Sequence, residues 1–393
     1  MTPSQNAHSR RALPRTVPAR PRRVLVIGAG TSGTAVTILL RRAGIAVDLI
    51  ETARDGNTTA GSGIALHGNA LRVLRELGVW EQVRREGYSF DEVGITTPDG
   101  AVLHVQQDIR TGGDDLPATV GIQRPRLQRI LLTAVRASRA ALHLGVSAEV
   151  LEQGERHAIV WFSDEQHASY DLVIAADGQN SSTRAAIGVD DEPERTGMAI
   201  WRAATPRPRE VTRTDLAYGG CCIIAGYCPT SESTLYAYLV EGRRDGASLD
   251  PASFAAQMRE LAAGYGGAWP QIAKSITDQA AVTHTWLDRL LVEGSWHRGR
   301  VVLVGDAAHV CPPMLAQGAA MSLEDAAVLA ELLAGRDTWD EQLLSDYYAR
   351  RIARVRPVVE ASVQLGRWQL DGAHGADMQS LISSSLRPLR ELP

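Results

Sequence analysis

The feature that most constrains the fold is a glycine-rich turn between two apolar runs near the start of the chain. Val24–Ile27 has the composition of a strand that is buried on both faces. The turn Gly28–Gly33 follows with the pattern GxGxxG, and Thr34–Arg42 has the apolar spacing of a helix. Val47–Ile50 is a second strand, which ends at Glu51. This segment therefore predicts a βαβ unit that binds a dinucleotide.

Each residue type in the turn has a physical role in such a unit. Gly28 permits the tight turn, Gly30 lets the backbone approach a pyrophosphate, and Gly33 lets the helix pack close to the strand. The N-terminus of the helix offers N–H groups and a partial positive charge to the phosphates. Glu51 can accept hydrogen bonds from ribose hydroxyls and repels a 2′-phosphate, so the site suits FAD or NAD better than NADP. The cofactor-binding residues expected here are Gly28, Gly30, Thr31, Ser32, Gly33 and Glu51.

Composition restricts the function classes that remain. The 393 residues are 44% hydrophobic and 22% charged, which is typical of a globular chain of two or three structural units. No apolar run is long enough for a membrane span, and the net charge of −4 gives no bulk attraction to nucleic acid. The four cysteines form neither a disulfide framework nor a zinc motif, which favours a reducing cytoplasm and no metal. Residues 1–21, rich in arginine and proline, are expected to form a disordered basic tail.

Two further apolar strands, far downstream, each end in a short acidic turn. The first turn is Asp177-Gly178, after residues 171–176, and the second is Gly305-Asp306, after residues 301–304. The second turn is followed by His309, expected to be a core or helix-start histidine, then by Pro312 and the turn Gln317-Gly318-Ala319.

In this order, the GxGxxG, DG and GD motifs resemble the single-component FAD-dependent aromatic hydroxylases of the para-hydroxybenzoate hydroxylase type, over residues 22 to about 355. The resemblance implies that all three motifs hold one FAD, together with Arg124, which matches an arginine that opens a helix beside the flavin. It further implies that Asp177 and Gly178 contact FAD and NAD(P)H, and that Gly305 and Asp306 contact the ribityl chain or its ribose neighbour. Pro312 and the turn Gln317, Gly318 and Ala319 would lie against the isoalloxazine ring. Relatives often have glycine where this chain has Ala316.

The resemblance implies a monooxygenase that uses FAD, NADPH or NADH, and O2. It would hydroxylate a small aromatic, enol-type or polyketide-like molecule through a flavin 4a-hydroperoxide. Such chemistry needs no nucleophile–base triad, and the sequence has no motif for one. Two alternatives stay open: a flavin-dependent reductase or dehydrogenase of a hydrophobic small molecule without oxygen insertion, and a non-catalytic flavin-binding protein. The oligomeric state is also left open.

Because the three motifs are far apart, the FAD-binding domain must be discontinuous. The expected fold is α/β, with a Rossmann-like FAD-binding domain of residues 22–93, 119–196 and 288–355. Residues 94–118 and 197–287 are expected to form a second, α+β substrate domain built on a mostly antiparallel sheet, with strands at 217–227 and 235–240 and a helix at 253–264. A small antiparallel meander is expected within 141–175, and a C-terminal helix near 358–370 with a tail within 356–393.

The substrate domain also holds the candidates for contact with a substrate. A sheet with tyrosines on one face can roof a flat ring over the flavin, although tyrosine also favours ordinary strand packing. The substrate-wall candidates are Tyr218, Tyr227, Tyr236 and Tyr238. The catalytic candidates are Arg202, which could contact a flavin edge, an anionic substrate or the nicotinamide, and His67, which could act as a base toward a phenol.

Overall fold

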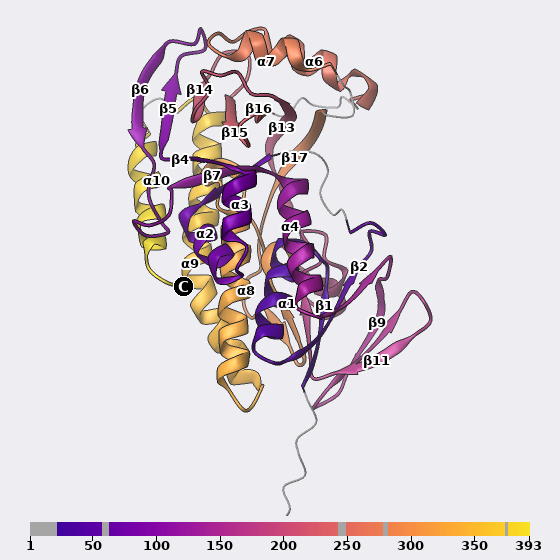
Figure 1. Ribbon diagram of the computed structural model, residues 1–393. Coiled ribbons are helices and arrows are strands. Elements are labelled where there is room, and N and C mark those ends of the chain that lie inside the picture. The colour runs from indigo at the N-terminus through magenta and orange to yellow at the C-terminus, as the bar shows by residue number, and fades with distance from the viewer. Residues whose placement is uncertain (1–21, 57–62, 243–248, 278–281, 374–375) are drawn as a thin grey trace, which may run out of the picture.

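A computed structural model describes residues 22–56, 63–242, 249–277, 282–373 and 376–393. The expected basic tail, residues 1–21, lies outside the described residues. Figure 1 shows a sheet flanked by long helices in the lower half of the molecule and a second sheet under α6 (Phe254–Ala262) and α7 (Trp269–Ser275) at the top. None of the helices in the described ranges combines the length and apolar character needed to cross a membrane.

The lower sheet forms around the GxGxxG unit. Its strand order is β18-β19-β12-β1-β2-β8, and all neighbours are parallel except β18 and β19. The strands are β1 (Arg23–Ile27), β2 (Ala46–Glu51), β8 (Ala141–Leu144), β12 (Leu172–Ala175), β18 (His297–Arg298) and β19 (Val301–Leu303). Because β1, β12 and β19 are parallel neighbours, their C-terminal ends lie at the same edge of the sheet. The GxGxxG, DG and GD turns therefore meet at that edge.

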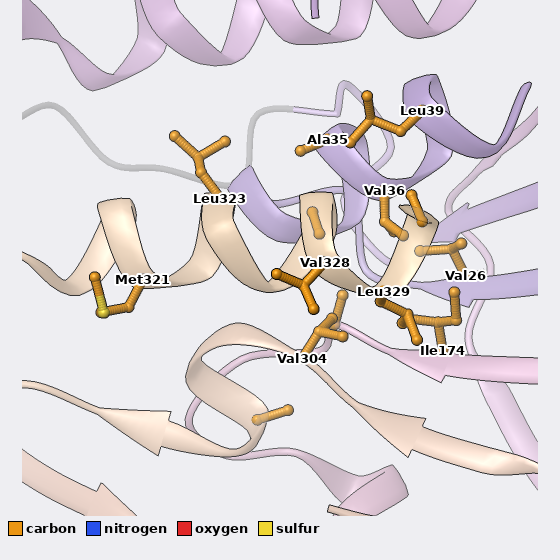
Figure 2. Packing of buried hydrophobic residues seen from close by; sticks show 14 of the residues in the cluster. Val26, Ala35, Val36, Leu39, Ile174, Val304, Met321, Leu323, Val328 and Leu329 are labelled. Atoms are coloured by element: carbon orange, nitrogen blue, oxygen red, sulfur yellow. The ribbon is translucent and has the colours of Figure 1, made fainter. Parts of the chain in front are cut away.

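The core lies between this sheet and its helices. Figure 2 shows Val328 and Leu329 of α8 (Gly318–Gly335) beside Val36 of α1 (Thr31–Arg42) and near Ile174 and Val304. These side chains are all buried, as the apolar strand runs predict. Helices α2 (Gly68–Glu76), α3 (Trp80–Glu86), α4 (Arg124–Ala137) and α5 (Ser182–Ala186) also belong to this half.

Two three-stranded antiparallel sheets accompany the core. The expected meander consists of β9 (Ala148–Gln153), β10 (Ala158–Phe162) and β11 (His167–Tyr170), whereas residues 141–144 join the parallel sheet as β8. The second sheet has the order β3-β7-β4 and is formed by β3 (Gly63–His67), β4 (Tyr88–Phe90) and β7 (Thr119–Gln123). Gly63 lies against Tyr236 of the upper sheet so closely that a Cβ would be 2.8 Å from the Tyr236 ring carbon Cγ. The small sheet thus links the two halves.

The upper sheet has eight strands in the order β20-β17-β13-β16-β15-β14-β5-β6, and only β14 and β5 pair in parallel. Its strands are β5 (Glu92–Thr96), β6 (Val102–Gln107), β13 (Glu194–Pro206), β14 (Thr214–Tyr218), β15 (Ile224–Pro229), β16 (Thr234–Gly242), β17 (Val282–Leu291) and β20 (His309–Val310). The expected α/β fold with a mostly antiparallel second sheet is confirmed. The expected domain boundaries at 93/94, 196/197 and 287/288 fall inside β5, β13 and β17, so the division of residues between the domains stays a proposal.

Two elements differ from the sequence expectation. The strand expected over 217–227 is instead the end of β14, a turn and the start of β15, because Gly219 and Gly220 adopt φ values of +83° and +87° and reverse the chain. The helix expected near 358–370 is the end of the longer α9 (Glu341–Leu370), which continues through Pro357. Buried side chains on both sides of the proline, including Val355 and Val358, stabilise the helix against the lost backbone bond. The chain then forms α10 (Met378–Leu386) and the short helix η5 (Arg387–Arg390).

Candidate active site

A cavity of about 750 Å³ lies at the edge of the parallel sheet where the three turns meet. Its wall comes from the glycine turn, the end of β2, the start of α4, the DG and GD turns and the start of α8. The predicted cofactor-binding residues that line it are Gly28, Gly30, Thr31, Ser32, Glu51, Arg124, Asp177, Gly178, Asp306, Gly318 and Ala319. Segments that are far apart in the sequence therefore form one site.

The glycine turn has the geometry that a pyrophosphate requires. Gly28 has a φ of +98°, and a Cβ there would overlap the Ala176 carbonyl oxygen, while a Cβ on Gly33 would overlap the Gly28 carbonyl oxygen. By contrast, a Cβ on Gly30 would meet no atom within 4 Å, because the backbone faces the open cavity. Helix α1 begins at Thr31 with no side-chain cap and no acidic residue in its first turn. Its N-terminal N–H groups are therefore available to an anion, and the turn fits the diphosphate of FAD.

Two buried side chains fix this turn. The Ala29 N–H donates to Glu51 Oε2 (2.9 Å), and the Ala53 N–H donates to Oε1 (2.8 Å). From α4, Gln128 Nε2 donates to the Ala29 carbonyl oxygen (2.6 Å). A carboxylate accepts about four hydrogen bonds, so Glu51 retains capacity for a ribose hydroxyl. Sequence analysis missed Gln128, although its position one helical turn after Arg124 is the spacing that puts two side chains on one face.

The DG turn is tied to the GD turn by a buried arginine. Asp177 Oδ1 accepts a hydrogen bond from Ser181 Oγ (2.6 Å), and Oδ2 accepts one from the Thr183 N–H (3.1 Å) at the start of α5. Arg184 Nη1 donates to the Ala307 carbonyl oxygen (3.1 Å) next to Asp306. Asp177 therefore shapes the turn as well as lining the cavity.

Charged groups from both halves of the molecule interact at the cavity. Arg124 and Asp306 lie deep among protein atoms, but both line the cavity, and solvent reaches their side chains through it. Burial lowers the pKa of Arg124 and nearby Arg202 lowers it further, whereas Tyr236 and Asp306 oppose the shift. Burial also raises the pKa of Asp306, against the opposing effects of His309 and Arg124. Arg124, with Arg202 nearby, therefore adds positive charge to a cavity that the carboxylates of Glu51, Asp177 and Asp306 also line, and a guanidinium favours an anionic ligand beside it.

The other predicted cofactor residues lie behind the cavity wall. They are Gly33, Gly305, Pro312 and Gln317. The Gly305 N–H donates to Asp325 Oδ2 (2.8 Å), and Gln317 is fully buried at the start of α8. Before it, Ala316 has a φ of +50°, a left-handed conformation that costs an L-residue roughly 1–2 kcal/mol. Ala316 and Gln317 thus shape the turn that places Gly318 and Ala319 at the cavity.

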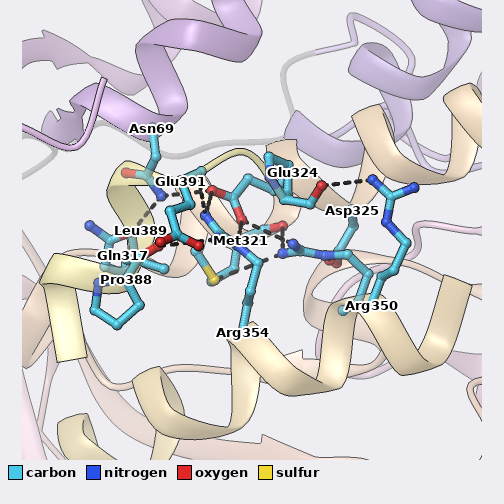
Figure 3. Close-up of polar contacts among 12 residues, drawn as sticks. Asn69, Gln317, Met321, Glu324, Asp325, Arg350, Arg354, Pro388, Leu389 and Glu391 are labelled. Carbon is cyan, nitrogen blue, oxygen red and sulfur yellow. Dashed lines mark hydrogen bonds and ion pairs between the residues drawn. The ribbon is translucent and has the colours of Figure 1, made fainter. Parts of the chain in front are cut away.

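An ion-pair network that sequence analysis did not identify supports this wall. Asp325 Oδ2 lies 2.6 Å from His309 Nε2, and Oδ1 accepts from Arg351 Nε (2.7 Å). Arg351 Nη1 also donates to Glu324 (2.9 Å), and Figure 3 shows Arg354 beside the same carboxylate. Burial alone would raise the pKa of Asp325, but His309 and Arg351 hold it at about 2. His309 is thus a core histidine, as expected, with a fixed carboxylate partner.

The two catalytic candidates are placed differently. His67 is not among the residues that line the cavity; its Nδ1 lies 3.4 Å from Thr119 Oγ1 and 3.8 Å from Asp108 Oδ2. Arg202, on β13, donates from Nη1 to the Thr285 hydroxyl of β17 and lies near Arg124. The structure therefore brings Arg202, but not His67, to the cavity region.

Three of the four tyrosines share the face of the upper sheet that is opposite α6 and α7; Tyr236 on this face lies near Arg124, but none of the four tyrosines is among the residues that line the cavity. Along β16, Tyr236 and Tyr238 alternate with Leu235, Ala237 and Leu239, which pack against α6 and α7 on the opposite face. Tyr218 lies with Tyr238 in a separate apolar cluster that includes Met314, from the η4 helix (Pro313–Leu315) after the GD turn. Tyr227 packs on the outer face, where its hydroxyl donates to Asp215 Oδ2 (3.0 Å).

Comparisons with known proteins agree with this geometry. Residues 22–362 match the family model described as FAD binding domain. The chain is 32% identical over 353 residues to 2-heptyl-3-hydroxy-4(1H)-quinolone synthase of Pseudomonas aeruginosa, with 88% of this chain and 90% of that protein covered. It is 29% identical over 369 residues to 6-hydroxynicotinate 3-monooxygenase of Bordetella bronchiseptica, with 86% and 90% covered. The crystal structure of Klebsiella pneumoniae HpxO complexed with FAD and uric acid has the same fold, with a TM-score of 0.78 at 24% identity and 94% and 92% covered.

The matched segment contains the glycine turn, the DG turn and the GD turn. The expected FAD cofactor and the resemblance to aromatic hydroxylases are confirmed, and NAD(P)H is the co-substrate typical of such proteins. The chain belongs to the FAD-dependent monooxygenases.

Proposed function

We propose that this monooxygenase hydroxylates a nitrogen-containing aromatic ring of the 4-quinolone type, at a carbon next to an ionisable oxygen. One relative supports this class by its name, the P. aeruginosa quinolone synthase, and the chain is also 28% identical over 350 residues to the aurachin C monooxygenase/isomerase of Stigmatella aurantiaca. The observation that carries the proposal is that Arg202 of the upper sheet lies near Arg124, which lines the FAD cavity, and that this sheet also has an apolar face.

When bound and reduced by NAD(P)H, FAD supplies activated oxygen from O2. The side chains supply charge and position. Arg202 and Arg124 favour the anionic form of a ring that carries an acidic N–H or O–H, because a guanidinium stabilises a neighbouring negative charge. An anionic ring is richer in electrons and reacts more readily with an electrophilic oxygen. The N–H groups at the start of α8, near Gly318, can stabilise negative charge on the cofactor.

The apolar sheet face supports a hydrophobic ring as the substrate. Leu216, Ile223 and Met314 pack there with Tyr218 and Tyr238. Burial raises the pKa of both tyrosines, so their phenols are neutral at pH 7. They therefore do not compete with an anionic substrate for the positive charge of the arginines. A wall of this kind keeps water away from the reacting atoms.

The test is turnover by purified enzyme loaded with FAD, with NADH and NADPH supplied separately. Substrates are 2-alkyl-4-quinolones, 6-hydroxynicotinate and urate, under isotopically labelled O2. The proposal predicts that quinolones accelerate NAD(P)H oxidation and that the product gains one labelled oxygen atom. Oxygenation of another ring but not of the quinolones would refute the substrate class, whereas reduced products without label would support the reductase alternative.

We also propose O2 as the co-substrate and the cytoplasm as the compartment. All four cysteines are free thiols, which supports a reducing environment.

A further inference from the structure

We propose that the C-terminal strap, Pro388–Glu391, positions the flavin-facing turn Gln317–Ala319 through Arg354, Glu324 and Asn69. The proposal rests on the proposed function only in that this turn contacts FAD. Gly318 and Ala319 line the cavity, whereas no strap residue does. The strap therefore acts on the cofactor at a distance.

The first link joins the turn to Asn69 of α2. Asn69 Nδ2 donates to Gln317 Oε1 (3.0 Å) and to Glu324 Oε1 (3.1 Å). Its own position is fixed by Thr111, whose Oγ1 accepts from the Asn69 N–H (2.9 Å) and donates to Asn69 Oδ1 (3.0 Å). Asn69, Gln317 and Glu324 are all fully buried. The orientation of Gln317 thus depends on where Glu324 holds the Asn69 amide.

The second link joins Glu324 to α9. Arg354 Nε donates to Glu324 Oε2 (2.9 Å) and Nη2 donates to Oε1 (2.8 Å), so one guanidinium contacts both oxygens. This bidentate contact fixes the plane of the Glu324 carboxylate, and therefore also the position of Oε1, which accepts the hydrogen bond from Asn69. Burial would raise the pKa of Glu324, but Arg351, Arg354 and Asn69 together lower it. The carboxylate is therefore ionised at neutral pH and needs its arginine partners.

The third link joins the arginines to the strap. Arg354 donates to the carbonyl oxygens of Pro388 (3.3 Å) and Glu391 (3.2 Å). Arg72 of α2, whose Nη2 is 3.9 Å from Glu324 Oε1, donates to the carbonyl oxygens of Leu389 (3.0 Å) and Glu391 (2.9 Å). Figure 3 shows Pro388, Leu389 and Glu391 gathered beside Glu324 and Arg354.

The strap supplies acceptors for guanidinium N–H groups that Glu324 does not use. An arginine has five N–H donors, and a partly buried one is held in a single orientation only when several are satisfied. All of these strap contacts are made by main-chain carbonyls, so they depend on the presence of the strap rather than on its side chains. Without the strap, Arg354 and Arg72 can turn toward solvent, and the Glu324–Asn69–Gln317 chain loosens.

The first experiment compares Arg354→Met with Arg350→Met in the FAD-loaded enzyme. Arg350 is the matched control because it lies on the same helix and donates to the Pro393 carbonyl oxygen (2.7 Å) and to Glu331, but not to Glu324. We expect Arg354→Met to raise the FAD dissociation constant about tenfold, a coupling of ordinary size. It should also make the midpoint potential of the bound flavin more negative, since the turn N–H groups stabilise the reduced form less well.

Arg350→Met should change neither the dissociation constant nor the potential. Arg354→Lys should recover part of the lost FAD affinity, because lysine keeps the positive charge but cannot make the bidentate contact with Glu324. Equal FAD dissociation constants and equal potentials for Arg354→Met and Arg350→Met would overturn the proposal.

The second experiment removes residues 387–393, and with them the strap carbonyls, while Glu324 and its arginine partners stay unsubstituted. We expect a similar loss of FAD affinity, about tenfold, and little additional loss when Arg354→Met is combined with the deletion, because both changes break one chain of contacts. If Arg354→Met does not fold, the deletion alone decides. If the unaltered chain binds no FAD, the proposed function and the strap both fail; if it binds FAD and the deletion binds equally well, only the strap fails.

Discussion

Replacing Gly30 or Gly33 with alanine should separate cofactor binding from stability within one turn. At Gly30 the backbone is extended, with φ −69° and ψ −165°, and an added Cβ meets no atom within 4 Å. Gly30→Ala should therefore change the free energy of unfolding of the FAD-free protein by less than about 1 kcal/mol. The new methyl group occupies the space where a pyrophosphate must approach, so the FAD dissociation constant should rise at least about tenfold, which is about 1.4 kcal/mol of binding energy.

Gly33→Ala should mainly lower the stability of the FAD-free protein, rather than block the approach of the pyrophosphate. The new Cβ would overlap the Gly28 carbonyl oxygen and lie 3.1 Å from the Gly28 carbonyl carbon and 3.2 Å from Ala176 Cβ. These neighbours are mainly backbone atoms, so helix α1 must move away from the sheet, at a cost of about 3 kcal/mol out of a total stability of about 5–15 kcal/mol. Urea unfolding of the FAD-free proteins and titration of flavin fluorescence measure the two effects. Equal destabilisation by both substitutions, or unchanged FAD affinity in Gly30→Ala, would refute this account of the turn.

Four other substitutions test the structure around the site. The pKa of Asp325 is about 2 in the folded protein against about 3.9 when unfolded, which predicts about 2 kcal/mol of stability that is present above roughly pH 4 and lost as the pH falls toward 2. Urea unfolding across this range should therefore show a smaller loss of stability in Asp325→Asn than in the unaltered chain, in which Glu324 and other carboxylates also contribute; equal losses would contradict the role of Asp325. Tyr227→Phe should lower the free energy of unfolding by about 1 kcal/mol, because the hydrogen bond to Asp215 is lost, and should leave kcat unchanged. Tyr238→Phe should alter KM or kcat with little effect on stability. Identical behaviour of the two variants would contradict the assignment of Tyr227 and Tyr238 to opposite faces of the sheet. Ala316→Gly should raise the melting temperature, because glycine adopts the left-handed conformation without strain. This gain exceeds the cost of the greater entropy that glycine gives the unfolded chain, by up to about 1 kcal/mol. A lower melting temperature would show that Ala316 is not strained.

The sequence predicts the FAD-binding edge well because its signals are local. Gly28, Gly30 and Glu51 belong to one βαβ unit, and each later turn follows its own apolar strand. Parallel pairing of those strands then brings the turns together without any further information. For this reason most residues expected at the cofactor also line the cavity.

The supporting contacts could not be predicted because they depend on residues distant in the chain. Arg351 pairs with Asp325 between two helices, and nothing in either segment marks the other. Tyr227 faces away from Tyr238 because the pairing of β15 with β16 places Tyr227 opposite Ala237 and Gly226 opposite Tyr238, a register between strands that neither strand marks by itself. His67 could be judged only once β3 and β7 placed it beside Thr119, outside the cavity wall.

The most direct test of the central claim is the stoichiometry of FAD binding, measured from flavin absorbance after removal of free cofactor. Three strand-end turns that form one cavity predict one FAD per chain, and weaker binding in both Gly30→Ala and Asp306→Ala. A protein that stays colourless after incubation with excess FAD, or that binds FAD unchanged when Gly30 and Asp306 are both replaced, would contradict the account.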